Sequence, residues 1–192
     1  MALFALKQLD GKESHPALLK LAGDPAVRAS ALRALTDRKT QLDGLDPKPF
    51  VAALADESPR VRAQALVSLG RLGDPSVAKD ILPLTARPKG SAMPTQRPVQ
   101  NQPDPDRVVP HLAVRALVSL RATDACLEAL DGPHRQGALW AMRYLHDPKT
   151  VDGLVKKLGT VRSPELRRGI LVTLIRLYHL SLIHISEPTR RS

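Results

Sequence analysis

A nine-residue pattern recurs along the 192-residue chain and constrains its fold more than any other feature. It reads VRASALRAL from Val27, VRAQALVSL from Val61, VPHLAVRAL from Val109, HRQGALWAM from His134 and LRRGILVTL from Leu166. Apolar or small residues recur at offsets 0, 4, 5 and 8, which lie on one face of an α-helix. Because the same amphipathic helix returns several times, the pattern predicts an array of stacked helical repeats.

Proline and glycine punctuate the same period. Six dipeptides place Asp or Ser before proline: Asp24-Pro25, Asp46-Pro47, Ser58-Pro59, Asp74-Pro75, Asp147-Pro148 and Ser163-Pro164. At a helix start the side-chain oxygen accepts a bond from a free backbone N–H, and proline loses no bond there. Gly11, Gly73 and Gly159 suit left-handed helix ends. The predicted helices are 2–9, 15–22, 25–37, 47–55, 59–72, 75–85, 107–121, 123–130, 133–146, 148–158 and 163–179.

These short and long helices alternate as antiparallel pairs, and the repeats resemble HEAT repeats. The stretch VSLGRLGDPSVAKDILPL is especially similar to the bacterial HEAT-like variety also found in phycobilisome lyases. The resemblance runs from Met1 to about His179, apart from one loop. It implies an all-α, right-handed alpha-alpha superhelix, a solenoid of about five helix pairs plus an orphan N-terminal helix.

In that family an Arg near the start of each second helix and an Asp in the preceding turn often form a ladder. Arg28, Arg62, Arg135 and Arg167 match the Arg position, but Pro110 replaces it in the third pair. The spacing of the Asp residues is irregular. A continuous ladder is therefore not expected here.

One stretch interrupts the predicted array. Residues 86–106 contain five prolines and almost no apolar side chain that a core could bury. Because such a segment cannot offset its ordering entropy with apolar contacts, we expect a mobile or extended surface loop between the two helices of one pair. The predicted domain is thus an array over residues 1–179 with an insertion at 86–106.

Both ends of the array are expected to be incomplete. The first helix carries Ala5, Leu6 and Leu9 in the slots of a second helix, but no pairing helix precedes it. Residues 180–192 resemble a translated sequencing-library adapter, and residues 180–190 all match. We therefore expect a non-native tail, into which a turn or two of helix can continue, after a fragment of a larger bacterial protein from an environmental genome. Leu171, Leu174 and Ile175 would then be uncovered.

Catalytic motifs are missing from the sequence. It contains no P-loop, GxGxxG, GxSxG, HExxH or CxxC, and its six histidines lack metal-ligand spacing. The single cysteine, Cys126, is expected to be a buried apolar residue. We expect no catalytic, metal-binding or cofactor-binding residue in this segment, while the activity of the whole parent protein stays open. No apolar run is long enough to span a membrane, so we expect a soluble protein of the cytoplasm or the bacterial periplasm.

Charge placement suggests where a partner binds. The net charge is +10, and fifteen of the nineteen arginines lie in or beside the second helices, which line the concave face of HEAT arrays. The candidate partner-binding residues are Arg28, Arg33, Arg62, Arg71, Arg115, Arg135, Arg143, Arg167 and Arg176. Guanidinium groups suit carboxylates and phosphates. Alternatively, these residues cap turns and helix ends or cover apolar surface with their stems.

The leading hypothesis is a non-catalytic protein-protein interaction scaffold that binds an acidic protein or peptide. A nucleic-acid-binding HEAT array is the first alternative, and Trp140 and Tyr144 would then stack on a base, although two such rings more often fill a core gap. A structural segment of a multidomain envelope protein with a c-type haem domain is the second. It is suggested by the stretch PELRRGILVTLIRLYH, which resembles the closing helix of HEAT arrays in such proteins. No CxxCH is present, so no haem ligand is assigned.

Overall fold

A computed structural model of the chain describes residues 2–86 and 105–185, with only the backbone described for residues 179–185. Within these ranges every regular element is an α-helix or a short 3-10 helix. The predicted all-α fold of successive helix pairs is therefore confirmed. The chain divides into two compact units, Met1–Leu120 and Arg121–Ser192, here called unit 1 and unit 2.

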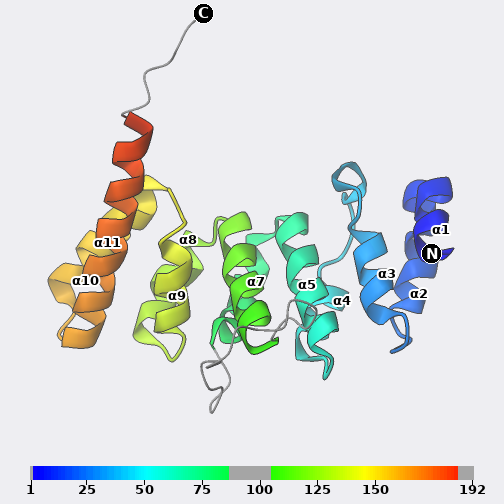
Figure 1. The fold of residues 1–192 in the computed structure, drawn as a ribbon, viewed down its shortest axis with the longest axis horizontal. Coiled ribbons are helices and arrows are strands. Elements are labelled where there is room, and N and C mark those ends of the chain that lie inside the picture. Colours follow the sequence, from blue (N-terminus) through cyan, green and yellow to red (C-terminus); the bar gives the residue numbers. More distant parts are fainter. Residues whose placement is uncertain (1, 87–104, 186–192) are drawn as a thin grey trace, which may run out of the picture. The chain divides into compact units, whose positions relative to one another are not determined.

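Unit 1 contains an N-terminal helix and three helix pairs. The α-helices are α1 (Ala2–Asp10), α2 (His15–Leu21), α3 (Arg28–Leu35), α4 (Lys48–Ala52), α5 (Pro59–Leu72), α6 (Ala78–Ile81) and α7 (Pro105–Ser119). The 3-10 helices are η1 (Gly11–Ser14), η2 (Lys39–Gln41), η3 (Ala53–Ala55), η4 (Pro75–Val77) and η5 (Leu82–Thr85). The second helices α3, α5 and α7 pack side by side, and α1 packs on α3 (Figure 1).

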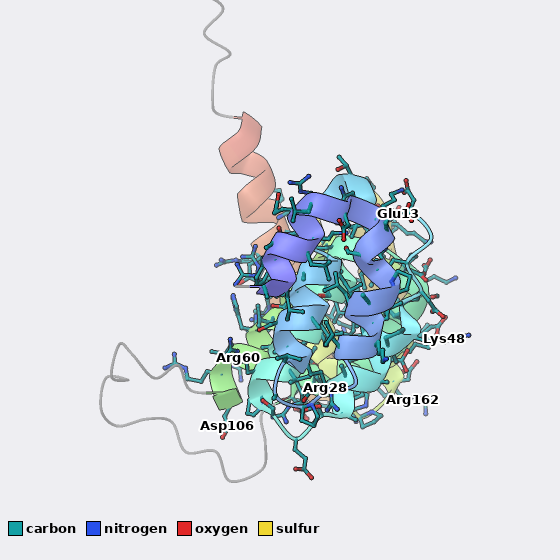
Figure 2. The ribbon with its side chains drawn as sticks, turned by 90° about the vertical axis from the view of Figure 1, so that its right-hand side faces the viewer. Glu13, Arg28, Lys48, Arg60, Asp106 and Arg162 are labelled. Atoms are coloured by element: carbon teal, nitrogen blue, oxygen red, sulfur yellow. The ribbon has the colours of Figure 1, made fainter. Side chains whose placement is uncertain are left out.

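The first and second helices of unit 1 form two layers. Arg60 of α5 and Asp106 of α7 lie on one side of the unit, while Glu13 of η1 and Lys48 of α4 lie on the other (Figure 2). This layering gives α5 neighbours on two sides, because α3 and α7 flank it, and its first helix, α4 with η3, packs behind it.

Unit 2 contains two helix pairs. Its elements are α8 (Thr123–Glu128), η6 (Ala129–Asp131), α9 (Arg135–Met142), α10 (Pro148–Thr160) and α11 (Pro164–Ile185). The second helices α9 and α11 pack together, and α8 packs on α10 (Figure 1). On α11, Leu171 and Ile175 are exposed as predicted, whereas Leu174 is half-buried.

Several first helices are shorter than predicted. The segment 75–85 forms η4, α6 and η5 instead of one helix. Pro83 has no backbone N–H to donate, so the α-helical hydrogen bonding of α6 does not continue through it. The segments 47–55 and 123–130 each end in a 3-10 turn. The helix predicted over 25–37 begins only at Arg28, after a turn that Asp24 closes by accepting from the Ala26 N–H at 2.9 Å.

The predicted helix boundaries are otherwise partly right. Asp46, Asp74 and Asp147 each accept from the N–H two residues later, all at 2.9 Å. Ser58 makes no such side-chain bond, so its predicted capping role is wrong. Gly11 and Gly73 have positive φ angles of 57° and 78°, as expected for left-handed residues. Gly159, in contrast, lies inside α10, which ends one residue later.

The core confirms the predicted helix face and extends it. On α5 the predicted residues Val61, Ala65, Leu66 and Leu69 are all buried. The structure adds offset 7 of the pattern, where small side chains are buried in every second helix, namely Ala34, Ser68, Ala116, Ala141 and Thr173. Small side chains at this offset allow neighbouring helices to approach closely.

The predicted loop and tail fall mostly outside the described residues. Of the segment 86–106, only Ala86, Pro105 and Asp106 are described, and the last two belong to α7, which therefore begins two residues earlier than predicted. At the other end, the helix predicted over 163–179 continues to Ile185, within the one or two further turns that the sequence allowed. Residues 186–192 lie outside the described part, and the origin of the tail stays a prediction.

Candidate functional site

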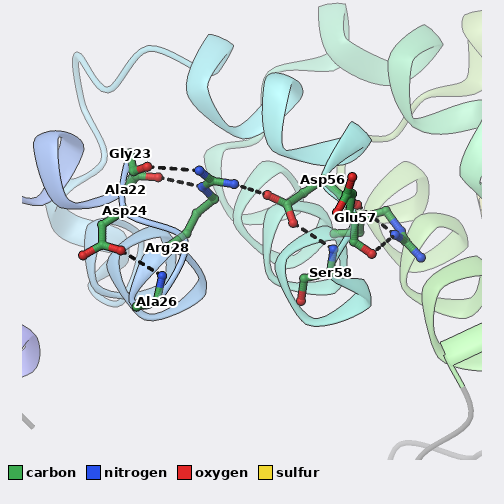
Figure 3. A network of polar contacts seen from close by, with 9 residues as sticks. Ala22, Gly23, Asp24, Ala26, Arg28, Asp56, Glu57 and Ser58 are labelled. Carbon is green, nitrogen blue, oxygen red and sulfur yellow. Dashed lines mark hydrogen bonds and ion pairs between the residues drawn. The ribbon is translucent and has the colours of Figure 1, made fainter.

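Arg28 links two successive helix pairs of unit 1. Its Nε donates to the carbonyl of Ala22 at 2.9 Å and its Nη2 to that of Gly23 at 3.0 Å, which closes the turn before α3. Its Nη1 donates to the carboxylate of Asp56, which precedes α5 (Figure 3). The donors of Arg28 therefore face acceptors of the protein itself, and the partner site proposed below does not depend on this residue.

Asp56 is the acceptor that makes this link possible. Its Oδ1 accepts from the backbone N–H of Ser58 at 2.9 Å, and this bond, followed by the Arg28 guanidinium, lowers the pKa of Asp56 below its ordinary value. In the sequence Asp56 stands six residues before Arg62, and this irregular spacing did not predict which arginine Asp56 would bind. The structure pairs it with the arginine of the preceding helix pair.

Three more of the predicted arginines bind backbone carbonyls. Arg62 donates to Asp56 and Glu57 at 2.8 and 2.9 Å. Arg167 donates to Leu158 and Val161 at 3.1 and 3.5 Å, and Arg71 donates to Asp37 at 2.5 Å. These contacts match the alternative interpretation from the sequence, in which arginines cap turns and helix ends.

Arg33 has an aromatic contact. Its guanidinium carbon lies 5.4 Å from the centroid of the Phe4 ring, within the range of a cation–π interaction between α3 and α1. Arg115 on α7 and Arg176 on α11 are exposed. The remaining two candidates, Arg135 and Arg143, lie together in a groove of unit 2.

Two grooves lie between consecutive second helices, one in each unit. The α5–α7 groove of unit 1 has a volume of about 580 Å³ and is mostly apolar, with Val67, Val108 and Leu112 in its walls and Arg60 at its side. The α9–α11 groove of unit 2 has a volume of about 420 Å³. Their linings share some positions of the repeat, such as Val67 and Trp140, but differ in residue type, which gives the two grooves different chemistry.

The α9–α11 groove is basic. It is lined by Arg135 of α9, by Arg143 directly after α9 and by Arg168 of α11, while Glu165 is its one acidic lining residue. Glu165 accepts a long hydrogen bond of 3.4 Å from the Gln136 side chain. Three guanidinium groups against one carboxylate leave this groove with an excess of positive charge.

Arg143 is the most unusual of these side chains. Its Nε is buried and donates to no acceptor among the described residues. A buried donor without an acceptor costs free energy, whereas a carboxylate bound by the same guanidinium would add charge-assisted bonds. The groove therefore contains a cation that the described part of the fold leaves without a counter-ion.

The lysines of the first helices in unit 2 are placed differently. Lys149 of α10 lies 2.7 Å from the carboxylate of Asp124, and Lys157 lies 2.5 Å from that of Asp131. These ion pairs join α10 to α8 and η6. The positive charge of these two lysines is thus balanced within the first-helix layer, and that of Arg135, Arg143 and Arg168 lies on the second helices.

The aromatic residues Trp140 and Tyr144 do not both fill a core gap. Tyr144 is 42% exposed, so it does not fill a core gap. Trp140 is half-buried and lines the α9–α11 groove beside Leu139 and Val172. Arg168 was not among the predicted partner-binding residues. The sequence did contain a signal for it. Arg168 follows Arg167, which matches the family position, and successive residues of a helix point to different sides, so the two arginines have different surroundings.

The described residues contain no group of three or more His, Cys, Asp or Glu side chains that could hold a metal ion. Cys126 is buried as predicted, and burial raises the pKa of its thiol to about 12. None of the described helices combines the length and the apolar character needed to cross a membrane.

Comparison with known families gives one match. Residues 16–92, which include α2 to η5 of unit 1, match the family model described as HEAT repeats. No curated protein matches the chain.

Proposed function

We propose that this protein is a non-catalytic interaction scaffold whose partner is an acidic protein or peptide, because residues 16–92 match the family model of HEAT repeats. HEAT repeats commonly act as protein-interaction scaffolds, because their stacked helices present extended surfaces. The observation that carries the choice of an acidic partner is the α9–α11 groove, where Arg135, Arg143 and Arg168 converge.

The chemistry of arginine supports this choice. A guanidinium group donates two parallel hydrogen bonds to a carboxylate, and such bonds are stronger than those between neutral groups. In unit 1, by contrast, Arg28, Arg62 and Arg71 each donate to a carbonyl or carboxylate oxygen, although Nε of Arg71 is buried without an acceptor among the described residues. The groove of unit 2 is therefore a better candidate for partner binding than the arginines near the turns of unit 1.

Nucleic acid is the second candidate partner, and the net charge of +10 favours it. A protein that binds a phosphate backbone uses many separate cations, each of which releases counter-ions. The engagement of several predicted arginines with the protein's own oxygens weakens this candidate, because fewer donors are left for a row of phosphates.

Binding measurements on the whole chain distinguish these candidates. We expect a fluorescent eight-residue peptide of alternating Glu and Leu to bind with an increase in anisotropy, and its Gln-for-Glu counterpart not to bind. A single-stranded oligonucleotide of similar net charge is the comparison ligand. Tighter binding of the oligonucleotide, with a steep salt dependence, would favour the nucleic-acid alternative, and binding of neither acidic ligand would refute the proposed function.

A further inference from the structure

We propose that the α9–α11 groove binds an extended peptide segment in which a carboxylate stands next to an apolar side chain. The carboxylate lies against Arg143, Arg168 adds positive charge to the groove, and the apolar side chain lies against Trp140 and Val172. This inference rests on the proposed scaffold function and names the ligand class and the residues that recognise it.

The floor of the groove is set by the close packing of α9 on α11. A Cβ atom at Gly169 would lie only 2.6 Å from Cδ1 of Leu139, so glycine permits this approach. Leu139 and Leu166, which are 6% and 4% exposed, close the bottom of the groove. Since the contact between α9 and α11 forms the floor, the groove is present whenever these two helices pack together.

The charged side chains come from both walls. Arg135 is the first residue of α9, Arg143 directly follows the end of α9, and Arg168 lies on α11. Glu165 and Gln136 are bonded to each other near the first turns of the two helices, which places the one carboxylate at that end. The positive charge of Arg143, at the opposite end of α9, is therefore less compensated, and this favours the carboxylate of a ligand there.

Apolar surface is available next to these cations. Val172 on α11 is 44% exposed, and Trp140 is half-buried on the facing helix. A ring and a branched side chain beside two guanidinium groups suit a ligand that is acidic and apolar at adjacent positions. A purely ionic ligand would leave this surface in contact with water.

The size of the groove favours a peptide over a polynucleotide. A volume of about 420 Å³ lies in the range of sites that enclose a few ligand side chains. A nucleic-acid backbone carries a regular row of phosphates, and the carboxylate of Glu165 in the groove repels such a row. A peptide can place a single carboxylate on Arg143, at the end of α9 away from Glu165, and avoid this repulsion.

The test compares two pairs of substitutions in the whole chain with the alternating Glu-Leu peptide as the probe. Arg143→Gln with Arg168→Gln removes two charges from the groove and is expected to weaken binding about tenfold or more, as for truncated charge pairs at interfaces. The matched control is Arg107→Gln with Arg162→Gln, which removes two charges from exposed residues outside the groove and should change binding less than about twofold.

A second comparison uses two neighbouring residues of α11 with nearly equal exposure. Val172 lines the groove, while Leu171, which is 45% exposed, does not. Val172→Glu is expected to abolish peptide binding, and Leu171→Glu to leave it within about threefold of wild type. Circular dichroism checks that both variants stay helical. This comparison does not depend on the folding of the arginine double variant.

A third comparison tests the apolar half of the inference. Replacing each Leu of the peptide by Ser is expected to weaken binding to the wild-type chain, because Trp140 and Val172 lose their contact. Equal affinities of the Leu and Ser peptides would overturn the apolar contact.

The failures of the two proposals are distinguishable. If the acidic peptide binds wild type and both arginine pairs weaken it equally, the groove is not the site but the scaffold function stands. If the peptide does not bind wild type, both proposals fail. If an oligonucleotide competes with the peptide at equal charge and is weakened by the same groove variants, the groove binds phosphate and the peptide assignment is wrong.

Discussion

Asp56 joins two helix pairs of unit 1 because its two carboxylate oxygens accept from different pairs. One oxygen accepts from Ser58 at the start of its own second helix, and the other accepts from Arg28 of the pair before. The side chains of Arg28 and Asp56 are 28% and 11% exposed, so water competes weakly for these bonds. The contact thus stabilises the spacing of α3 and α5.

Substitution of Arg28 tests this contact. Arg28→Met keeps the apolar stem but removes every donor, so we expect a loss of about 1–3 kcal/mol in the free energy of unfolding, the range for bonds to charged groups. The measurement is urea unfolding followed by circular dichroism. Arg115→Met, at an exposed position of α7, is the control and should change the free energy by less than about 0.5 kcal/mol. Equal effects of the two substitutions would contradict a specific link.

Lys7 and His15 form an unusual polar contact between α1 and α2. Lys7 is fully buried, and its Nζ lies 2.5 Å from Nε2 of His15 and 3.3 Å from the carbonyl of Gly11. The ammonium group can donate to Nε2 only while that nitrogen carries no proton. Burial, followed by the charge of Lys7, lowers the pKa of His15 below its ordinary value, and burial also lowers the pKa of Lys7.

The sign of the resulting pH dependence follows from linkage. Because the folded pKa of His15 is below the ordinary value of 6.5, the unfolded chain binds the proton first as the pH falls. We therefore expect stability to be lost as the pH falls from about 6.5 toward the folded pKa. Amide hydrogen exchange in α1 and α2, compared with α5 at matched intrinsic rates, measures this loss.

A non-titrating replacement is the control for this prediction. His15→Gln offers Lys7 an uncharged acceptor, so its α1 and α2 amides should show a weaker dependence on pH than those of the wild-type chain. The same acid sensitivity in both proteins would show that another group is responsible.

Helix α5 is the best test of how the second helices pack. It lies between α3 and α7, and a Cβ atom at Gly70 would come within 3.3 Å of the backbone Cα of Ala116. Ser68, at the small-residue offset, bonds to Thr36 at 2.9 Å and to the carbonyl of Leu32 at 3.3 Å. Close packing of this kind leaves little room for the core to relax around a cavity.

Neighbouring residues of α5 provide a matched pair of substitutions. Leu66 is fully buried, so Leu66→Ala should lower the free energy of unfolding by about 2–5 kcal/mol. Val67 is 39% exposed, and Val67→Ala should cost less than about 1 kcal/mol. Urea midpoints of the two variants decide the matter. A larger effect at Val67 than at Leu66 would mean that the buried face of α5 is misassigned.

The division of the chain into two units has a consequence for cooperativity. Each repeat contacts only its neighbours, so the stability of such a protein is close to a sum of local terms. Unit 1 and unit 2 each contain fully buried aliphatic residues, for example Leu35 and Leu69 in the first and Leu154 and Ile170 in the second. Damage to one core is expected to stay largely local.

Hydrogen exchange of a unit 2 variant tests this expectation. Ile170→Ala removes a fully buried side chain of α11, so amides of α9, α10 and α11 should exchange faster. Those of α2 and α3 in unit 1 should keep their wild-type rates. Uniformly faster exchange in both units would indicate that the chain unfolds as a single cooperative body.

The sequence by itself determined the fold class and the core face of most second helices. Helical periodicity and capping are local, since they depend on residues within a few positions of one another. For this reason the buried positions Val61, Ala65, Leu66 and Leu69 could be predicted, as could the left-handed Gly11 and Gly73. The local rules failed where two of them compete. In the segment 75–85 the apolar pattern favours one continuous helix, whereas Pro83 interrupts the helical hydrogen bonding.

Only the tertiary structure decided what each arginine does. The side chains of Arg28, Arg62, Arg143 and Arg167 all occur at second helices, and sequence spacing cannot separate them. Whether a guanidinium meets a carbonyl, a carboxylate or an open groove depends on turns and neighbouring helices that are distant along the chain. The pairing of Arg28 with Asp56 and the meeting of Arg143 with Arg168 in one groove arise from packing between repeats, and no local pattern contains that information.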